Sequence, residues 1–303
     1  MLSLLAPGQG SQTPGMLTEW LEQPGAHDRV AAWSETVGLD LVRLGTVATA
    51  DEITDTAVTQ PLVVASALLA FNELRSRNVD LPADTVVAGH SVGELAAAAI
   101  TGVITDDEAV RLAGIRGGEM AKACALEATT MAAVLGGDEA AVLARLAELD
   151  LIPANRNAVG QIVAAGSVAA IDELIANPPE KARIRKLAVA GAFHTHYMAP
   201  ARDAVAAAAA DITPNDPNRT LLSNSDGAAV TDGAVALAKL VEQVTSPVRW
   251  DLCSATMRAA GVDAVIELTP AGALVGIAKR ELKGVPSRAV KVPADLEDLP
   301  GLG

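Results

Sequence analysis

Aromatic residues and cysteine are scarce in this chain. Phe, Trp and Tyr make up 2% of its 303 residues, so the core must be built from Val, Leu, Ile and Ala. The two cysteines, Cys124 and Cys253, form neither a CxxC motif nor the spacing of a zinc site. Two cysteines without such spacing favour a protein that lies in a reducing compartment and forms no disulfides.

Basic residues are also in deficit, and the formal net charge is −14. Nucleic-acid binding is therefore not expected, because phosphate contacts need clustered Lys and Arg. The N-terminus lacks the basic start of a signal peptide, and Pro7 and Gly8 interrupt its apolar run too early. No uncharged apolar stretch reaches the roughly 18 residues that cross a bilayer. We expect a soluble, cytoplasmic protein that does not contact a membrane.

Half of the residues are apolar, and segments of helical and strand character alternate along most of the chain. This alternation predicts an α/β fold with a mostly parallel sheet. Proline at the start of the segment 61–78 is typical of a helix N-terminus. The expected strands are 2–6, 85–88, 219–223 and 263–267, and the expected helices are 61–78, 93–100, 106–123, 200–210, 233–244, 251–260 and 271–280.

The pattern changes near Thr129. From there to residue 189 the order is βαββαβ, which is typical of a ferredoxin-like unit. We expect a small subdomain at 126–190, inserted into a large unit formed by 1–125 and 191–303 that resumes with a loop from Ala190. The tail after Val292 is expected to be poorly structured. The expected elements of the insertion are strand 131–135, helix 138–149, strands 151–155 and 161–165, helix 168–176 and strand 184–189.

A GxSxG motif supplies a candidate nucleophile. Ser91 lies in Gly89-His90-Ser91-Val92-Gly93, between the apolar run 85–88 and an alanine-rich helix. Strand, GxSxG and helix is the arrangement of a nucleophile elbow, in which small flanking residues permit a tight turn and the serine projects at a helix N-terminus. A Gly-rich turn without chemistry is the alternative.

A serine nucleophile needs a base, and the chain has four histidines. His27 has no motif around it, and the side chain of His90, inside the elbow, should point away from that of Ser91. His194 and His196 lie just after the inserted segment, and one of them is the candidate base unless both are structural. Because no histidine follows His196, the usual α/β-hydrolase triad order is excluded. A base oriented by a backbone carbonyl fits this order.

Arg116 is the candidate for substrate recognition. In helix 106–123 it shares one face with apolar residues, and a buried guanidinium is unfavourable unless it meets an anion. Guanidinium suits bidentate recognition of a carboxylate. The alternatives are an arginine that extends to the surface or one that pairs with Glu119.

Together these motifs resemble those of the malonyl-CoA:acyl carrier protein transacylases, in the order of that family and over nearly the whole chain. Two positions depart from its pattern: Thr269 stands where glycine often precedes the proline, and Val159 where proline often precedes Gly160. The matching motifs are Pro7-Gly8-Gln9-Gly10-Ser11-Gln12, Thr59-Gln60-Pro61, Gly89-His90-Ser91-Val92-Gly93-Glu94, Arg116-Gly117, Asn155-Arg156-Asn157, Gly160-Gln161, Phe193-His194, Gln243 and Pro247-Val248-Arg249-Trp250.

The resemblance implies a hydrolase-like core with a ferredoxin-like insertion, and a role for each matching residue. Ser91 carries the acyl group, and His194 is its base because it follows a phenylalanine. Arg116 binds the malonyl carboxylate. The remaining implied roles are the Gln243 backbone carbonyl as the group that orients His194, the backbone N–H groups of Gln9 and Val92 as the oxyanion hole, Phe193 as a wall that favours malonyl over branched units, and Asn155 and Asn157 as substrate-binding residues.

The implied reaction is ping-pong transfer of malonyl from malonyl-CoA, through a malonyl-serine ester, to the phosphopantetheine thiol of holo acyl carrier protein. It needs no metal and no other cofactor, and the default oligomeric state is a monomer. The alternatives are a serine hydrolase such as a thioesterase, and a non-catalytic binding module.

Carrier proteins of this family are typically acidic, so docking on this acidic enzyme needs a local group of basic residues. The alternative for each candidate group is a set of solvated surface charges without a partner. The candidates are Arg183, Arg185 and Lys186, with Lys279 and Arg280.

Overall fold

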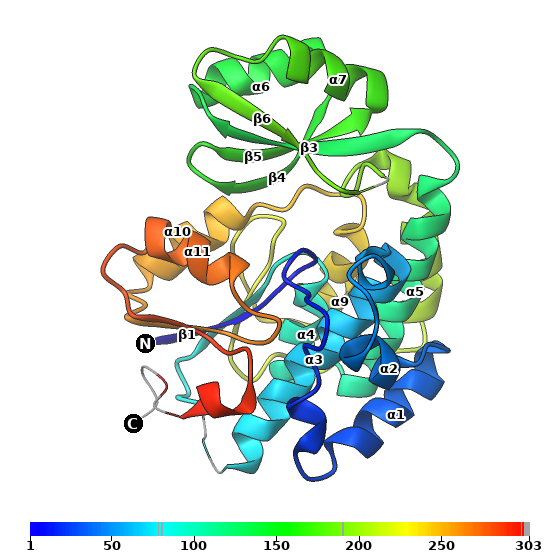
Figure 1. Cartoon of the computed structure of the whole chain (residues 1–303). Coiled ribbons are helices and arrows are strands. Elements are labelled where there is room, and N and C mark those ends of the chain that lie inside the picture. Colours follow the sequence, from blue (N-terminus) through cyan, green and yellow to red (C-terminus); the bar gives the residue numbers. More distant parts are fainter. Residues whose placement is uncertain (78, 80, 190, 298, 300–303) are drawn as a thin grey trace.

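The computed structural model describes residues 1–77, 79, 81–189, 191–297 and 299, and it contains two sheets (Figure 1). The larger sheet has six strands in the order β10-β9-β1-β2-β7-β8, and all its neighbouring pairs are parallel except β7 with β8. This confirms the prediction of a mostly parallel sheet; the sequence reading missed β8 and β10. The strands are β1 (Leu2–Ala6), β2 (Val86–Gly89), β7 (Thr220–Leu222), β8 (Ala229–Val230), β9 (Ala264–Glu267) and β10 (Ser287–Ala289).

Helices cover both faces of this sheet, because successive side chains of a strand point to opposite faces. Leu4 of β1 belongs to one apolar cluster, and the next residue, Leu5, belongs to another on the opposite face. Helices α10 (Trp250–Ala259) and α11 (Ala273–Glu281) pack on the face of Leu5. On the other face α4 (Gly93–Ile100) packs against β1 and β2, and further helices pack around it in the apolar cluster that contains Leu4. These further helices are α1 (Ala26–Val37), α2 (Leu41–Thr46), α3 (Thr56–Ser76), α5 (Asp106–Cys124), α8 (Ala199–Ala209) and α9 (Gly233–Glu242).

Helix α3 begins earlier than its proline indicates. The expected start was Pro61, but the helix begins at Thr56, where the Asp55 side chain accepts a hydrogen bond from the Ala57 backbone N–H at 2.9 Å. The aspartate cap therefore sets the start, and Pro61 lies inside the helix. Helix α3 is long and apolar enough to cross a membrane, yet 78% of its most apolar window is buried in the protein. It serves as a core helix.

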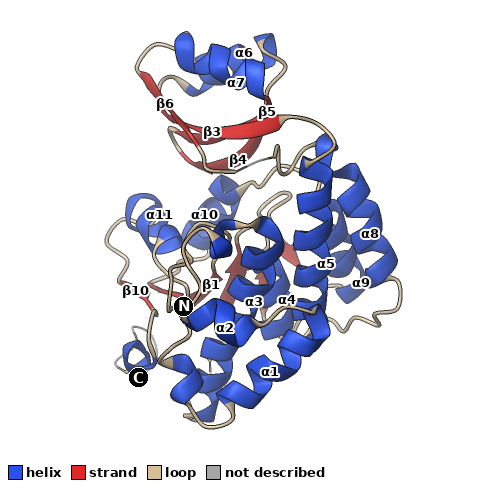
Figure 2. Ribbon diagram, turned by 45° about the vertical axis from the view of Figure 1, so that its right-hand side comes forward, coloured by secondary structure: helices blue, strands red, loops and turns tan. Residues whose placement is uncertain are grey.

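The smaller sheet is antiparallel, in the order β4-β5-β3-β6. Its two helices pack on one face, and the other face turns toward the rest of the protein (Figures 1 and 2). This confirms the ferredoxin-like pattern. Position 190, where the large unit was expected to resume, lies outside the described residues. The elements are β3 (Thr129–Gly136), α6 (Glu139–Glu148), β4 (Ile152–Ala158), β5 (Gln161–Ser167), α7 (Val168–Ala176) and β6 (Ala182–Lys186).

The prediction of a poorly structured tail after Val292 was wrong for the residues described there. A 3-10 helix spans Pro293–Leu296, and the Asp295 side chain accepts hydrogen bonds from the backbone N–H groups of Lys291 and Val292. Leu296 and Leu299 are buried in the main apolar cluster. The burial of these two leucines holds the segment against the core, although its other residues are typical of a loop.

Candidate active site

Ser91 lies in a strained turn between β2 and α4. Its φ is +54°, in the left-handed region that non-glycine residues rarely adopt. Both flanking glycines are required by close backbone contacts. A Cβ on Gly89 would lie 2.1 Å from the Gly93 carbonyl carbon, and one on Gly93 would lie 2.3 Å from the Ala6 carbonyl oxygen. The sequence therefore folds here into the predicted elbow, with strain of a kind that is typical of functional sites.

His194 is the histidine that contacts the serine. Its Nε2 lies 2.8 Å from Ser91 Oγ, and its Nδ1 lies 2.9 Å from the backbone carbonyl oxygen of Gln243. His196 is exposed and stacks on Tyr197 instead. His90 points away from the serine, with its Nε2 2.8 Å from Asn157 Oδ1. The geometry thus selects His194 over His196.

The environment of His194 keeps its imidazole neutral. Burial, together with the nearby charge of Arg116, lowers its pKa to about 3, although the hydrogen bond to the Gln243 carbonyl opposes the shift. A carbonyl that accepts from Nδ1–H leaves the lone pair on Nε2, toward Ser91 Oγ. This arrangement is compatible with a neutral imidazole that can accept a proton from Ser91.

Gln9, from the loop after β1, and Val92, next to Ser91 in the turn, are the candidates for an oxyanion hole. Val92 and Gln9 both line the cavity that contains Ser91. Among the described residues, no acceptor takes the N–H of either one. The Ser91 N–H is already used, because it donates to Asn224 Oδ1 at 2.8 Å. The amides of Gln9 and Val92 are thus available to an oxyanion.

Arg116 is buried, with 2% of its surface exposed, and its guanidinium faces the serine. Nη1 donates to Gln60 Oε1, and Nη2 donates to Gln243 Oε1 at 2.9 Å and lies 3.4 Å from Ser91 Oγ. Burial lowers its pKa to about 10, so it stays cationic at neutral pH.

The alternatives for Arg116 are excluded by this geometry. It does not extend to the surface, and Glu119 pairs with Lys122 at 2.7 Å. Among the described residues, no carboxylate lies within 4 Å of the Arg116 guanidinium. The cation is held by neutral amide oxygens, which leaves it able to pair with the anion of a ligand.

Three polar residues of the site were missed as functional residues by the sequence reading. Gln60 and Asn224 are buried, as is Glu94, which follows the elbow. Gln60 and Glu94 belong to motifs that match the family, but the sequence does not indicate what their side chains contact. Asn224 comes from a segment with no motif, so only the fold reveals it.

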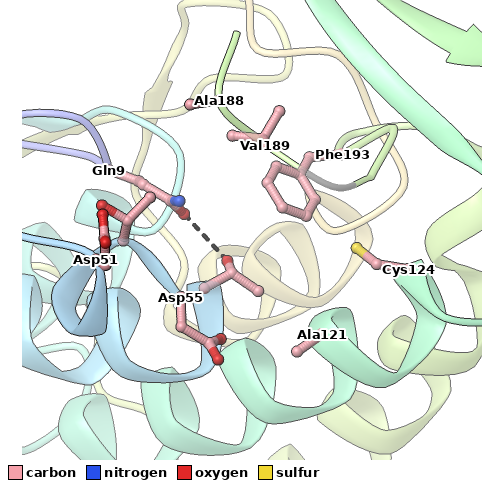
Figure 3. A pocket seen from close by; sticks show the side chains of 10 residues that line it. Gln9, Asp51, Asp55, Ala121, Cys124, Ala188, Val189 and Phe193 are labelled. Carbon is pink, nitrogen blue, oxygen red and sulfur yellow. Dashed lines mark hydrogen bonds between the residues drawn. The ribbon is translucent and has the colours of Figure 1, made fainter. Parts of the chain in front are cut away.

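A cavity of about 290 Å³ lies in front of Ser91. Asn155 and Asn157 line it from β4 and are almost fully buried, and Phe193 lines it from the loop before His194. A second hollow of about 400 Å³ shares Gln9, Val189 and Phe193 with the first (Figure 3). The Phe193 ring therefore borders both spaces.

Comparisons with known proteins show the family to which the chain is similar. A family model described as "Acyl transferase domain" matches residues 4–296. The protein named malonyl CoA-acyl carrier protein transacylase from Mycobacterium tuberculosis (strain ATCC 25618 / H37Rv) is 64% identical over 302 residues, which covers 100% of both chains. The protein of the same name from Escherichia coli (strain K12) is 32% identical over 295 residues, or 95% of each chain.

Solved structures give the same result. The crystal structure of MCAT from Mycobacterium tuberculosis superposes with a TM-score of 0.96 at 64% identity and covers 98% of each chain. A structure described as a type II PKS acyl-carrier protein in complex with its malonyl-transacylase superposes with a TM-score of 0.89 at 29% identity and covers 97% of each chain. The likeness extends over both sheets.

Proposed function

The chain belongs to the acyl transferase family and, within it, to the malonyl CoA-acyl carrier protein transacylases, and from this premise we propose which of its residues perform the reaction. Members of this family transfer malonyl from malonyl-CoA to acyl carrier protein in fatty-acid synthesis. We propose that Ser91 carries the malonyl group and that His194 is the base. The observation that carries this proposal is the Arg116 guanidinium, 3.4 Å from Ser91 Oγ and without a carboxylate partner among the described residues.

In the first half-reaction, His194 Nε2 accepts the proton of Ser91 Oγ while that oxygen attacks the thioester carbonyl carbon. The N–H groups of Gln9 and Val92 stabilise the oxyanion. As the tetrahedral intermediate collapses, the C–S bond breaks and the thiol of CoA leaves with the proton from His194. The Gln243 carbonyl stabilises the imidazolium in between, in place of a triad carboxylate.

In the second half-reaction, the phosphopantetheine thiol gives its proton to His194 and attacks the malonyl-serine ester. The ester C–O bond breaks, and Ser91 Oγ recovers the proton. We propose that Asn155 and Asn157 line the path of the substrate, because both are buried in the wall of the cavity. No step needs a metal or a redox cofactor.

The alternative is a thioesterase that uses the same elbow. Mass spectrometry after incubation with malonyl-CoA should show a gain of one malonyl group, located by proteolysis to the peptide that contains Ser91. Holo acyl carrier protein should remove this group and become malonylated much faster than water releases it. Release to water at the same rate with and without the carrier protein would favour the hydrolase.

We further propose that the enzyme works as a cytoplasmic monomer, in which the segment 126–190 acts as a small subdomain. Ser91, His194 and Arg116 contact one another within a single copy of the chain, so the proposed chemistry does not require a residue from a second copy. Asn155 and Asn157 come from the small sheet, and Ser91 and Arg116 from the large unit. The substrate cavity is therefore formed where the two units meet.

Phe193 should restrict the extender unit. Its ring borders the catalytic cavity, so a methyl group on malonyl C2 should collide with it. We expect kcat/KM for methylmalonyl-CoA to be lower than for malonyl-CoA by at least about 10-fold, the lower end of what one extra carbon in a pocket gives. Phe193→Leu should bring the kcat/KM for methylmalonyl-CoA closer to that for malonyl-CoA. Equal kcat/KM values in the wild type would contradict the steric role.

The carrier protein should dock beside α11. Arg280 on this helix donates to Gln161 Oε1, and Gln161 lines the catalytic cavity, so the pair Lys279 and Arg280 lies near the entrance. The other candidate group, on β6, is partly neutralised, because Lys186 pairs with Asp172 at 2.8 Å.

Lys279→Glu combined with Arg280→Glu should raise KM for the carrier protein on the order of 10-fold at low salt, because electrostatic attraction to an acidic partner is lost. Serine loading from malonyl-CoA should stay unchanged. Arg183→Glu with Arg185→Glu on β6 is the matched comparison and should have the smaller effect. An unchanged KM for the α11 variant would exclude that docking surface.

A further inference from the structure

Glu94 is a buried acid that the mechanism above does not use. It lies in the first turn of α4, three residues after the nucleophile, with 6% of its surface exposed. Among the described residues, no Lys or Arg side chain pairs with it within 4 Å. Its carboxylate instead accepts two hydrogen bonds, from the Asn224 backbone N–H at 2.7 Å and from Gln243 Nε2. Burying a carboxylate without a cationic partner destabilises a fold, which indicates that Glu94 has a role in the site.

The first consequence of Glu94 concerns the side chain of Gln243. A carboxylate only accepts hydrogen bonds, so the amide of Gln243 must turn its Nε2 toward Glu94. Nε2 also donates to the Ser91 carbonyl at 2.9 Å. Oε1 is then left to face Arg116 Nη2 at 2.9 Å. Glu94 thus sets which end of this amide meets the guanidinium.

The second consequence concerns Asn224. While its backbone N–H is held by Glu94, its side chain bridges the elbow: Oδ1 accepts from the Ser91 N–H, and Nδ2 donates to the Gly89 carbonyl, each at 2.8 Å. The Ser91 N–H is consumed in this way, and the adjacent N–H of Val92 is left for the oxyanion. One carboxylate therefore supports the loop of the nucleophile and the residue that holds the arginine.

We propose that Glu94 is a positioning residue for malonyl transfer, whose carboxylate orients Gln243 toward Arg116 and Asn224 toward the Ser91 turn. The inference rests on the proposed roles of Ser91, His194 and Arg116. It adds that the arginine selects malonyl only while an acceptor-only group holds Gln243 in this orientation. A glutamine at position 94 has the same size, but it presents an amide that can donate to or accept from Gln243.

The titration of Glu94 gives the proposal a second readout. Burial raises its pKa to about 7, against the hydrogen bonds from Asn224 and Gln243 and the charges of Arg116 on α5 and Lys239 on α9. Cys253 on α10, also near it, stays a neutral thiol because burial raises its pKa. Protonation gives Glu94 a donor and releases Gln243, so activity should rise as pH rises through about 7. The pKa of His194, about 3, is too low to produce that rise.

The experiment compares wild type, Glu94→Gln and Glu242→Gln. Glu242 is exposed and adjacent to Gln243, and its substitution removes the same charge. For each protein, kcat/KM for serine loading is measured with malonyl-CoA and acetyl-CoA between pH about 6 and about 8. Circular dichroism and thermal unfolding check the fold.

In Glu94→Gln we expect kcat/KM for malonyl-CoA to fall on the order of 10-fold or more at the upper pH, acetyl-CoA to fall less, and the rise near pH 7 to disappear. Glu242→Gln should match the wild type. A folded Glu94→Gln protein with wild-type preference for malonyl-CoA and a wild-type pH profile would overturn the proposal. Failure of the wild type itself to load malonyl on Ser91 would instead refute the proposed function.

If Glu94→Gln does not fold, Glu94→Asp carries the test. Aspartate keeps the acceptor-only charge but is one methylene too short to reach both Asn224 and Gln243. We expect its malonyl kcat/KM to fall while a pH-dependent rise persists. Wild-type kcat/KM in Glu94→Asp would overturn the positioning role.

Discussion

Ser91→Ala should abolish covalent loading from malonyl-CoA. The substitution removes the hydroxyl that contacts His194 Nε2 and lies 3.4 Å from Arg116 Nη2, and this hydroxyl is the proposed attachment point of the malonyl group. Mass spectrometry after incubation with malonyl-CoA should therefore show an unmodified protein. A malonyl adduct in Ser91→Ala would mean that another residue is the nucleophile.

His194→Ala should lower the transfer rate by roughly 10²–10⁴-fold, the usual span for a lost general base. His196→Ala is the matched control, because His196 lies two residues away and is exposed. Since the pKa of His194 is lowered to about 3, the base stays neutral in mild acid, and no acid limb near the usual histidine pKa of about 6.5 should come from this residue. A larger loss in His196→Ala than in His194→Ala would contradict the assignment.

The sequence predicted best the parts of this site that depend on local geometry. The elbow of Ser91 needs a strand, two glycines and a helix in immediate succession, and all of these are visible in one short motif. The choice between His194 and His196 was not local. The residues alone left it open, and the resemblance favoured His194. In the structure His194 Nε2 lies 2.8 Å from Ser91 Oγ while His196 is exposed, which supports His194 as the proposed base.

The fold shows the same division. Periodicity predicted the long central elements and the ferredoxin-like order, because each of these buries a recognisable face. It missed β8 and β10, which have two and three residues and take their stability from neighbouring strands. Asn224 was missed for a related reason. Its role comes from contacts with Ser91 and Glu94, which lie more than a hundred positions away along the chain.

Arg116→Ala should change which thioester the enzyme prefers. The guanidinium is buried and held by the amide oxygens of Gln60 and Gln243, so the malonyl carboxylate would be its first anionic partner. Truncating one member of a buried, hydrogen-bonded charge pair costs roughly 2–5 kcal/mol. We therefore expect kcat/KM for malonyl-CoA to fall by a factor on the order of 10²–10³.

Acetyl-CoA has no carboxylate to offer, so its kcat/KM should fall little in Arg116→Ala or even rise. Arg116→Lys should restore malonyl transfer only in part, because an ammonium cannot form the two-pronged contact. Arg111→Ala is the matched control on the same helix. Its guanidinium donates to the Ala208 carbonyl rather than to any residue of the site.

The decisive quantity is the ratio of kcat/KM for malonyl-CoA to that for acetyl-CoA, in the wild type and in Arg116→Ala. A carboxylate partner predicts that this ratio collapses, while a residue that supports the fold or binds the CoA portion predicts equal losses for both thioesters. The ratio also tests a second possible role, because Arg116 Nη2 lies 3.4 Å from Ser91 Oγ and could act on the serine itself. In that case kcat/KM would fall equally for malonyl-CoA and acetyl-CoA, and the carboxylate role would have to be abandoned.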